Sequence, residues 1–532
     1  MAVSASRQAS ETGVAILNQE GNAFDAAAAM GFVLAVTHPQ AGNLGGGGFL
    51  VARTAEGALL SLDFRETAPA KAHQDLFLGP DGEPDPERSL HSPLASGVPG
   101  SVDGLLQLWE RHGSGNITRY ALMGDAIRLA REGFPLTPGL AADLNGKAET
   151  FARNPAREVF VREDGRPWQA GDVLIQQDLA LTLGAIAAEG REGFYAGRVA
   201  RFIAEQQAAT GGLITLEDLA GYRTVYREPV RGAFHDYEIV TMGPPSSGGV
   251  LLLQMLNMLE EHDLQGLGWG SSAYIHLLTE VQRRAYADRS RYLGDPEFWP
   301  VPLAALLSKD YARGRARSID PLHATKSSDI APGLEAARES PETTHYTVAD
   351  QDRNVVAVTT TLNASFGSGI VIAGAGFLMN NEMDDFSAKP GAPNRYGLVG
   401  GEANAIKPGK RMLSSMTPTI VLKSGKPHLV LGSPGGSTII TTVLQNFLNV
   451  TVWGMNIQEA VSAPRHHSQW LPDEIVAEPR SINADTWRNL ESMGHRLVQR
   501  EGAIGQTNAI HITEEGLYGA PDPRGDNAAA GY

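Results

Sequence analysis

Thr343 is the residue of this 532-residue chain whose surroundings best suit covalent chemistry. It follows residues 321–342, a stretch rich in Pro, Ser, Ala and charge that predicts a linker, and it directly precedes a strand pattern. A threonine hydroxyl is a weak nucleophile unless a base lies beside it, and an N-terminal threonine carries that base as its own α-amine. A cut between Glu342 and Thr343, made by attack of the Thr343 hydroxyl on the Glu342 carbonyl, would create it. Taken alone, a Thr-Thr pair at the start of a strand is more often structural.

Two further motifs offer the other parts of an acyl-transfer site. The sequence "GSPGGS" places Gly435 and Gly436 between a strand and a predicted helix, where backbone N–H groups can face a developing oxyanion. A tight strand-to-helix turn is the simpler reading of this motif. The sequence "NNEMDDFS" gathers Glu382, Asp384 and Asp385 after an apolar strand, which suggests a cation site. A solvated turn explains the same cluster equally well.

The elements around these motifs are mostly hairpins. "THYTVA" and "VVAVTTTLN" form one hairpin, and "TPTIVLKSGKPHLVLGS" forms a second that turns at Ser424-Gly425 and leads through "PGG" into the helical pattern "STIITTVLQNFLNV". "NAIHITEEGLYGA" forms a third, and "FLVARTAEGALLSLDFRET" gives two strands with Arg65 at the end of the second. "GNAFDAAAAMGFVLAV" predicts a buried helix, and the glycine run in "NLGGGGF" predicts backbone packed closely against a neighbour.

Composition excludes several classes of function. The formal net charge is −16 with no run of Lys or Arg, so nucleic acid and anionic membrane surfaces are poor partners. The apolar run 26–36 is too short to span a membrane, and "MAVSASRQAS" has no apolar region typical of a signal peptide. The absence of cysteine excludes disulfides, thiolate metal sites and a thiol nucleophile. The adjacent His466 and His467 cannot face one metal from one side of a helix, which favours a structural or surface role.

Long motifs of the chain resemble the γ-glutamyltransferase (glutathione hydrolase) family, from about residue 13 to 532 in the same order. "TTHYTVAD", "TTTLNASFGSG", "MNNEMDDFSAKPGAPNRYGLVGGEANAI", "KRMLSSMTPTIV" and "GSPGGSTIITTVLQ" are similar to its small subunit. "GNAFDAAAA", "THPQAGNLGGGGF", "DFRETAP", "PPSSGG" and "AYADRSRYLGDP" are similar to its large subunit. The resemblance implies an α+β fold of the N-terminal nucleophile (Ntn) hydrolase type, a four-layer αββα sandwich. It implies self-cleavage into residues 1–342 and 343–532, which stay interwoven as one unit.

The resemblance also implies a role for each matching residue. Thr343 is the nucleophile toward γ-glutamyl compounds, Thr361 orients it, and Gly435 with Gly436 forms the oxyanion hole. The remaining assignments concern the substrate: Arg65 with Ser414 and Ser415 binds its α-carboxylate, Asn363, Glu382 and Asp385 bind its α-ammonium, and Tyr396 lies in a lid loop. A planar guanidinium suits a carboxylate, and carboxylates suit an ammonium. The family uses no cofactor or catalytic metal, takes γ-glutamyl donors with amino acid or peptide acceptors, and is usually exported to the periplasm or outside the cell.

Two other readings stay open. A cephalosporin or glutaryl acylase shares the fold and the nucleophile, but a glutaryl group has no α-ammonium for Glu382 and Asp385 to bind. A non-catalytic γ-glutamyl-binding protein that never matures has no need of Thr343, Thr361 and the glycine pair. A denaturing gel separates the second reading from the others, because only a matured hydrolase gives two bands.

Overall fold

The computed structural model describes residues 1–331, 343–389 and 401–531. The predicted positions Glu342 and Tyr396 lie outside these described residues. Helices and mainly antiparallel sheets share the chain, so the expected α+β class is confirmed. Among the described residues, no helix combines the length and apolar character needed to cross a membrane.

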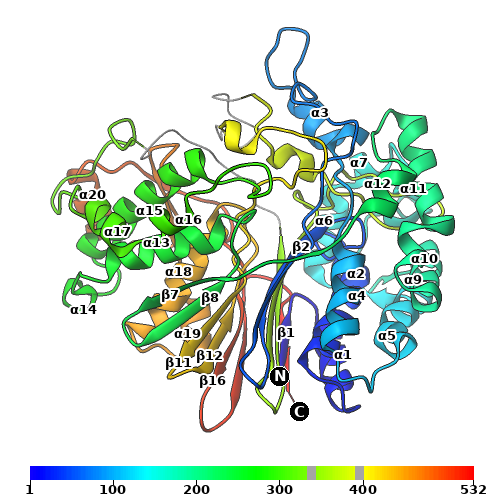
Figure 1. The fold of residues 1–532 in the computed structure, drawn as a ribbon, viewed down its shortest axis with the longest axis horizontal. Helices are drawn as coiled ribbons and strands as arrows, with labels where there is room; N and C mark the ends of the chain where they lie inside the picture. The colour runs from blue at the N-terminus through cyan, green and yellow to red at the C-terminus, as the bar shows by residue number, and fades with distance from the viewer. Residues whose placement is uncertain (332–342, 390–400, 532) are drawn as a thin grey trace.

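Two large sheets occupy the centre of the molecule (Figure 1). The first has the order β18 (Ala528–Ala530), β1 (Ala2–Ser4), β9 (Thr344–Ala349), β10 (Val355–Thr361), β2 (Gly47–Arg53), β3 (Leu59–Asp63) and β6 (Val225–Tyr226). The second has the order β17 (Leu517–Pro521), β16 (Asn508–Ile512), β12 (Lys426–Leu431), β11 (Thr419–Lys423), β8 (Tyr237–Thr241) and β7 (Val230–Phe234). The strands of the three predicted hairpins and of the predicted strand pair before Arg65 are therefore confirmed, and they come from both ends of the chain.

Long helices lie beside each sheet. Figure 1 shows α1 (Arg7–Leu17), α2 (Ala23–Thr37), α4 (Ser101–His112) and α5 (Arg119–Glu132) beside the first sheet, and α13 (Gly248–Leu259), α15 (Ser272–Tyr292) and α18 (Thr438–Thr451) beside the second. The other helices are α3 (Pro86–His91), α6 (Pro138–Gly146), α7 (Ala148–Phe151), α8 (Arg157–Phe160), α9 (Gln177–Glu189), α10 (Glu192–Tyr195), α11 (Gly197–Thr210), α12 (Leu216–Gly221), α14 (Leu264–Leu267), α16 (Leu303–Leu306), α17 (Lys309–Ala316), α19 (Ile457–Ser462) and α20 (Ala484–Ser492). Short elements are η1 (Pro93–Ala95), η2 (Glu382–Asp385), η3 (Glu402–Asn404), β4 (Phe134–Pro135), β5 (Val173–Leu174), β13 (His466–His467), β14 (Ile475–Ala477) and β15 (Leu497–Gln499).

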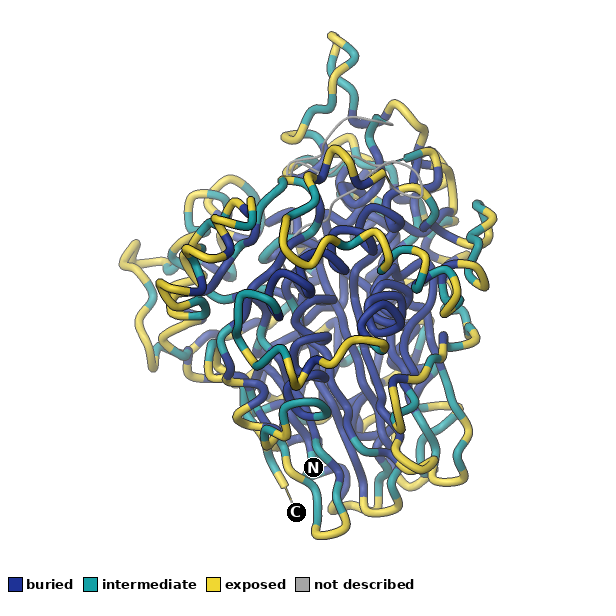
Figure 2. Tube along the Cα trace, turned by 90° about the vertical axis from the view of Figure 1, so that its left-hand side faces the viewer, coloured by how far each residue is buried: buried dark blue, intermediate teal, exposed yellow. Residues whose placement is uncertain are grey.

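The strand β10 shows how the core is divided. Val356 and Val358 join the apolar cluster that contains α2, whereas Val355 and Ala357 join the cluster that contains strands of the second sheet. Because successive side chains of a strand point to opposite faces, both faces of the first sheet are covered. Figure 2 accordingly shows the central strands buried, with exposed residues concentrated in peripheral loops.

The described part of the predicted linker, residues 321–331, is anchored to the rest of the chain at two residues. Ser327 and Ile330 are buried, and the Ser327 carbonyl accepts a hydrogen bond from Trp470 Nε1 at 2.7 Å. Asp473 Oδ2 accepts from Ser327 N at 2.8 Å. Residues 321–331 form no helix or strand and are mostly exposed, as the predicted linker over 321–342 requires, but contacts with residues far along the chain anchor them at Ser327 and Ile330.

Candidate active site

The β9–β10 hairpin places Thr343 beside Thr361. Thr344 pairs with Thr360 in this antiparallel ladder, so one further residue along the same register puts Thr343 opposite Thr361. Thr343 is 7% exposed at the open end of the hairpin. On the other side of β10, a Cβ on Gly46 would lie 2.1 Å from the Thr361 carbonyl oxygen, a distance no side chain tolerates. The glycine run therefore packs closely against this strand end, as its sequence predicts.

The turn between β12 and α18 brings Gly435 and Gly436 to the same place. Both residues have positive φ, +133° and +56°, which favours glycine. Neither backbone N–H donates a hydrogen bond to any residue that the structure describes. The turn is thus tight, as the simpler reading expects, and it also leaves two N–H groups available beside Thr343.

A small cavity, here called the charged pocket, collects the predicted residues. It encloses about 10 Å³ of space. Its lining consists of Arg65, Thr343, Thr361, Asn363, Glu382, Asp385, Ser414, Ser415, Met416, Gly436 and Ile439. The predicted site residues within the described chain therefore lie here, except Asp384 of the acidic cluster and Gly435, and Gly435 lines a neighbouring cavity together with Thr343.

Arg65 lines the charged pocket and pairs with two of its carboxylates. Its Nη2 donates to Asp385 Oδ2 at 2.5 Å, and its Nη1 donates to Glu382 Oε1. Arg65 is 1% exposed, and both carboxylates are buried on η2. The reading of "NNEMDDFS" as a solvated turn is thus wrong, and the cation beside the cluster is the chain's own guanidinium.

Charge in this pocket is unbalanced. Glu66, a third buried carboxylate, lies 3.7 Å from Arg65 Nη1, and neither of its oxygens accepts a hydrogen bond from a described residue. Burial raises the pKa of Glu66 to about 7, although Arg65 opposes the shift. Burial likewise raises the pKa values of Glu382 and Asp385 against the effect of Arg65. Three carboxylates therefore share one directly paired guanidinium.

The other lining residues are held by short contacts. Ser414 O accepts from Ser247 N at 2.6 Å and from Ser247 Oγ at 2.7 Å. Ser415 Oγ is buried and has no hydrogen-bond partner among the described residues. Asn363 has φ +74°, and its N–H donates to Thr361 Oγ1 at 2.8 Å. Thr361 therefore fixes the turn that presents Asn363 to the pocket.

Two residues that contribute to the site were not predicted from the sequence. Glu66 stands next to Arg65 in "DFRET", and Ser247 stands in "PPSSGG", so both lie inside motifs that the sequence singles out. Arg289 Nε donates to Ser247 Oγ at 2.7 Å and thereby links α15 to the loop behind Ser414. The available signal was the polar character of these motifs, but only the folded chain shows which side chains they face.

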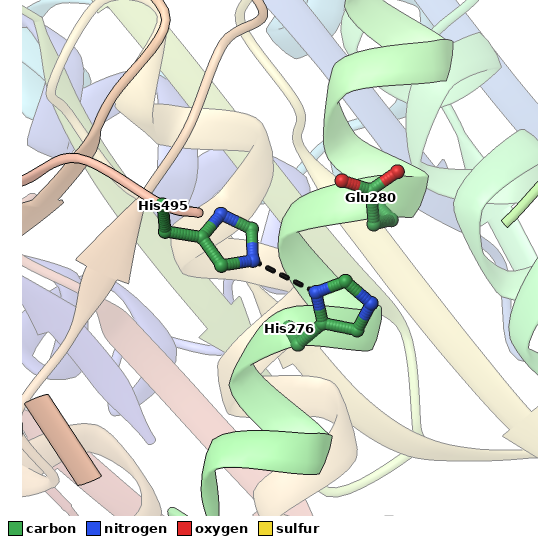
Figure 3. Close-up of side chains that lie close together, drawn as sticks. All are labelled: His276, Glu280 and His495. Atoms are coloured by element: carbon green, nitrogen blue, oxygen red, sulfur yellow. Dashed lines mark hydrogen bonds between the residues drawn. The ribbon is translucent and has the colours of Figure 1, made fainter. Parts of the chain in front are cut away.

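A separate cluster has the composition of a metal site but not its bonding. His276, Glu280 and His495 place ligand atoms within 4.8 Å of one another (Figure 3). His276 donates from Nε2 to the Asp320 carbonyl at 2.7 Å, so its Nδ1 accepts from His495 Nε2 at 2.7 Å. Glu280 accepts from two buried guanidiniums, those of Arg283 and Arg284. Because these guanidiniums already neutralise the carboxylate and repel a cation, the cluster is best explained as a structural tie.

The predicted histidine pair is structural too. His466 and His467 are both buried, in β13. His467 Nδ1 lies 2.8 Å from Thr441 Oγ1 on α18, and its Nε2 lies 2.7 Å from Gln469 Oε1. The structural alternative is thus confirmed over the surface alternative for this pair.

Comparisons with known proteins identify the family of the chain. A family model described as Gamma-glutamyltranspeptidase matches residues 9–532. The chain is 49% identical to the glutathione hydrolase proenzyme of Escherichia coli (strain K12), covering 100% of this chain and 92% of that protein. The crystal structure of cephalosporin acylase from Bacillus halodurans matches with a TM-score of 0.86 and 27% identity, covering 100% of this chain and 95% of that one. The crystal structure of Helicobacter pylori gamma-glutamyltranspeptidase matches with a TM-score of 0.60 and 43% identity, covering 62% of this chain and 94% of that one. The family model over residues 9–532 and the 49% identity to a full-length relative show that the chain belongs to the gamma-glutamyltranspeptidase family.

Proposed function

We propose that this chain is a self-cleaving enzyme that hydrolyses γ-glutamyl amides, such as glutathione, and transfers the γ-glutamyl group to water or to amino acid and peptide amines. The observation that carries the proposal is the position of Thr343 on the wall of a buried pocket that also holds Arg65, Glu382 and Asp385. A nucleophile there faces groups able to bind both charges of an α-amino acid.

Maturation comes first. The Thr343 hydroxyl attacks the Glu342 carbonyl, the peptide C–N bond breaks, and the acyl group passes from nitrogen to oxygen as an ester. Water opens this ester and leaves a free Thr343 α-amine with an ordinary pKa of about 7.7–8. The products are a large subunit, 1–342, and a small subunit, 343–532. The pairing of β9 with β1 and of β10 with β2 supports a product in which both pieces stay interwoven.

Catalysis reuses the same hydroxyl. The α-amine of Thr343 takes the hydroxyl proton as the oxygen attacks the γ-carbonyl, and it returns that proton to the departing amine as the C–N bond breaks. Gly435 and Gly436 stabilise the oxyanion, and Thr361 orients the nucleophile. Water or an acceptor amine then attacks the γ-glutamyl ester and frees the hydroxyl. No cofactor enters this sequence.

Substrate binding exchanges charge partners in the charged pocket. Arg65, with Ser414 and Ser415, receives the α-carboxylate, whereas Glu382, Asp385 and Asn363 receive the α-ammonium. A substrate carboxylate that takes Arg65 from Asp385 leaves that buried carboxylate without its 2.5 Å partner. Only a substrate that also brings a cation restores the balance, because an unpaired buried charge is costly.

The glutaryl acylase reading is the second candidate, and the match to a cephalosporin acylase structure favours it at the level of fold. Charge balance disfavours it. A glutaryl group would add one negative charge to a pocket in which Glu66, Glu382 and Asp385 already surround Arg65. We therefore infer a preference for γ-glutamyl over glutaryl substrates.

Three further assignments belong to the same proposal. We infer that the two sheets and their helices follow the four-layer αββα order of the Ntn hydrolases. Tyr396, in the segment outside the described residues, is assigned to a lid over the pocket. We also infer export to the periplasm or outside the cell, on the strength of the family alone.

The experiment that tests the proposal is a comparison of wild type with Thr343→Ala. Wild type should give two bands of roughly 36 and 20 kDa, in proportion to their share of 56.7 kDa, and the smaller should begin Thr-Thr-His-Tyr. Thr343→Ala should stay one chain and release no nitroaniline from γ-glutamyl p-nitroanilide. Thr347→Ala, at a buried threonine on the strand β9 that follows Thr343, should still be cleaved. A different N-terminus for the smaller band would contradict the assignment of the nucleophile.

A further inference from the structure

A second cavity, here called the polar cavity, also touches Thr343. It encloses about 550 Å³, far more than the charged pocket. Thr343 and Gly435 lie on its wall, beside residues that follow α2 and residues at the start of β16 and just before β18. Its charged and amide-bearing lining residues are His38, Gln40, Asp143, Arg500, Gln506, Asn508, Arg524, Asp526 and Asn527.

Acyl transfer at Thr343 needs two binding regions. The carbonyl carbon carries the acyl group on one side and the departing or attacking amine on another, so both partners must fit around one nucleophile. The charged pocket takes the γ-glutamyl part under the function proposed above. The polar cavity is the second cavity that shares Thr343 and a glycine of the turn, and it is large enough for a peptide.

The wall of the polar cavity carries two buried oxygen atoms that can accept hydrogen bonds. Gln40 Oε1 and Asn508 Oδ1 are buried without a hydrogen-bond partner among the described residues. Buried acceptors of this kind are costly unless something donates to them. The N–H groups of a peptide are suitable donors, so the wall favours an amide-bearing ligand over an apolar one.

One cation of the cavity is available to a ligand. Arg524 is occupied: its Nε and Nη2 each donate to Glu478 at 2.8 Å, and its Nη1 donates to Asp522 at 3.0 Å. Arg500, in contrast, forms no ion pair or side-chain hydrogen bond with any residue in the described ranges. Its guanidinium can therefore bind a ligand carboxylate without first breaking an existing pair.

The carboxylates of the cavity set the orientation of the ligand. Asp526 Oδ2 accepts from Thr137 Oγ1 at 2.5 Å, and Asp143 Oδ2 accepts from Gln40 Nε2 at 3.2 Å. These contacts come from neutral donors and so supply no positive charge that would offset the repulsion of an anion by the two carboxylates. A peptide carboxylate is driven toward Arg500 and away from Asp143 and Asp526.

We propose that the polar cavity binds the amine partner of the reaction, and that Arg500 binds the C-terminal carboxylate of a peptide acceptor or leaving group there. The inference deepens the proposed function and rests on it. It adds to that function the residue of this chain that selects among peptide acceptors by their C-terminal carboxylate.

The test compares two acceptors that differ only in that charge. Transfer from γ-glutamyl p-nitroanilide is measured with glycylglycine and with glycylglycinamide, using the matured enzyme. For wild type, kcat/KM should be higher for glycylglycine. Arg500→Ala should lower the ratio of kcat/KM for glycylglycine to kcat/KM for glycylglycinamide by about 3- to 30-fold, mainly by raising the KM of glycylglycine. This is the size of effect expected when one partly exposed contact between charged groups is lost. Arg500→Lys should restore most of the ratio.

Arg496→Ala is the matched control, since Arg496 is 72% exposed and does not line the cavity. This variant should keep the wild-type ratio. An unchanged ratio in Arg500→Ala, or an equal loss with both acceptors, would overturn the assignment of Arg500. Failure of the proposed function looks different, because wild type would then release no nitroaniline even without an acceptor.

Discussion

Asp385→Asn tests the exchange of charge partners in the charged pocket. In the free protein Asp385 Oδ2 lies 2.5 Å from Arg65 Nη2, and Arg65 also pairs with Glu382. Under the proposed function, the substrate α-carboxylate takes Arg65, and the substrate α-ammonium takes Asp385. The substitution removes one charge while it keeps the size of the side chain, so it alters the electrostatics without opening a cavity.

The magnitude follows from two opposing terms. Breaking one desolvated, hydrogen-bonded charge pair typically costs about 2–5 kcal/mol. The substitution also removes the Asp385–Arg65 pair from the free enzyme, which frees Arg65 for the substrate. Because kcat/KM compares the transition state with the free enzyme and substrate, the second change offsets part of the first. We therefore expect a net loss of about 2–3 kcal/mol, which is roughly a 30- to 150-fold fall in kcat/KM.

The assay measures kcat/KM for γ-glutamyl p-nitroanilide and for glutaryl p-nitroanilide. Asp385→Asn should lower kcat/KM for γ-glutamyl p-nitroanilide by roughly 30- to 150-fold. It should also reduce the ratio of this kcat/KM to that for glutaryl p-nitroanilide, because the neutral amide of Asn does not need a cation as its partner. Self-cleavage should survive, since the Glu342–Thr343 bond presents no α-ammonium.

Asp384→Asn is the matched control for this assay. Its carboxylate accepts from Ser89 Oγ at 2.5 Å, and it does not line the pocket. This variant should keep the preference for the γ-glutamyl anilide. Equal wild-type kcat/KM values for the two anilides would refute the binding of a substrate ammonium by Asp385 and would favour the glutaryl acylase function.

Two other substitutions probe the oxyanion turn and a buried histidine. Gly435→Ala should lower kcat for the γ-glutamyl anilide by about 100-fold or more, as for loss of an oxyanion donor, because its φ is +133° and its Cβ would lie 2.5 Å from Thr438 Oγ1. Gly425→Ala, in an open β-turn, should keep kcat. In His466→Gln, the free energy of unfolding should fall less between pH 7 and pH 4.5 than it does in the chain that keeps His466. Burial lowers the pKa of His466 to about 4, so only the unfolded chain takes up its proton below about pH 6.5. The difference should reach about 2–3 kcal/mol in urea unfolding of the uncleaved Thr343→Ala chain, and parallel pH dependences would contradict it.

Local patterns predicted most of the elements that hold the site. The hairpin that ends at Thr361 follows from β-branched residues around a polar turn, and its register then fixes Thr343 opposite Thr361. The helix Ala23–Thr37 follows from an alanine-rich run, and all its residues are buried. These features depend on neighbours within about twenty residues, which is the range that a sequence pattern describes.

The charge pairing and the anchored linker could not be predicted in the same way. Arg65 meets Asp385 across 320 residues of chain, and each belongs to a motif that looks complete by itself. A basic residue and an acidic cluster suggest two separate ligand contacts, whereas the fold places them in contact with each other. Ile330 is buried for a similar reason, since its partners come from distant elements. Such pairings depend on tertiary packing, which composition and periodicity do not encode.

Under the proposed assignments, the two cavities at Thr343 impose different demands on the two partners of the reaction. The charged pocket is small, and Arg65 is already paired with carboxylates of the pocket, so a donor must displace Arg65 from them and supply both charges at once. The polar cavity is about 550 Å³ in volume and offers one unpaired cation among its described lining residues. An acceptor therefore gains affinity from a carboxylate but does not have to break an internal ion pair to bind. Strict selection of the donor and tolerant selection of the acceptor thus follow from the same placement of one threonine between a tight, self-paired pocket and a roomy, polar one.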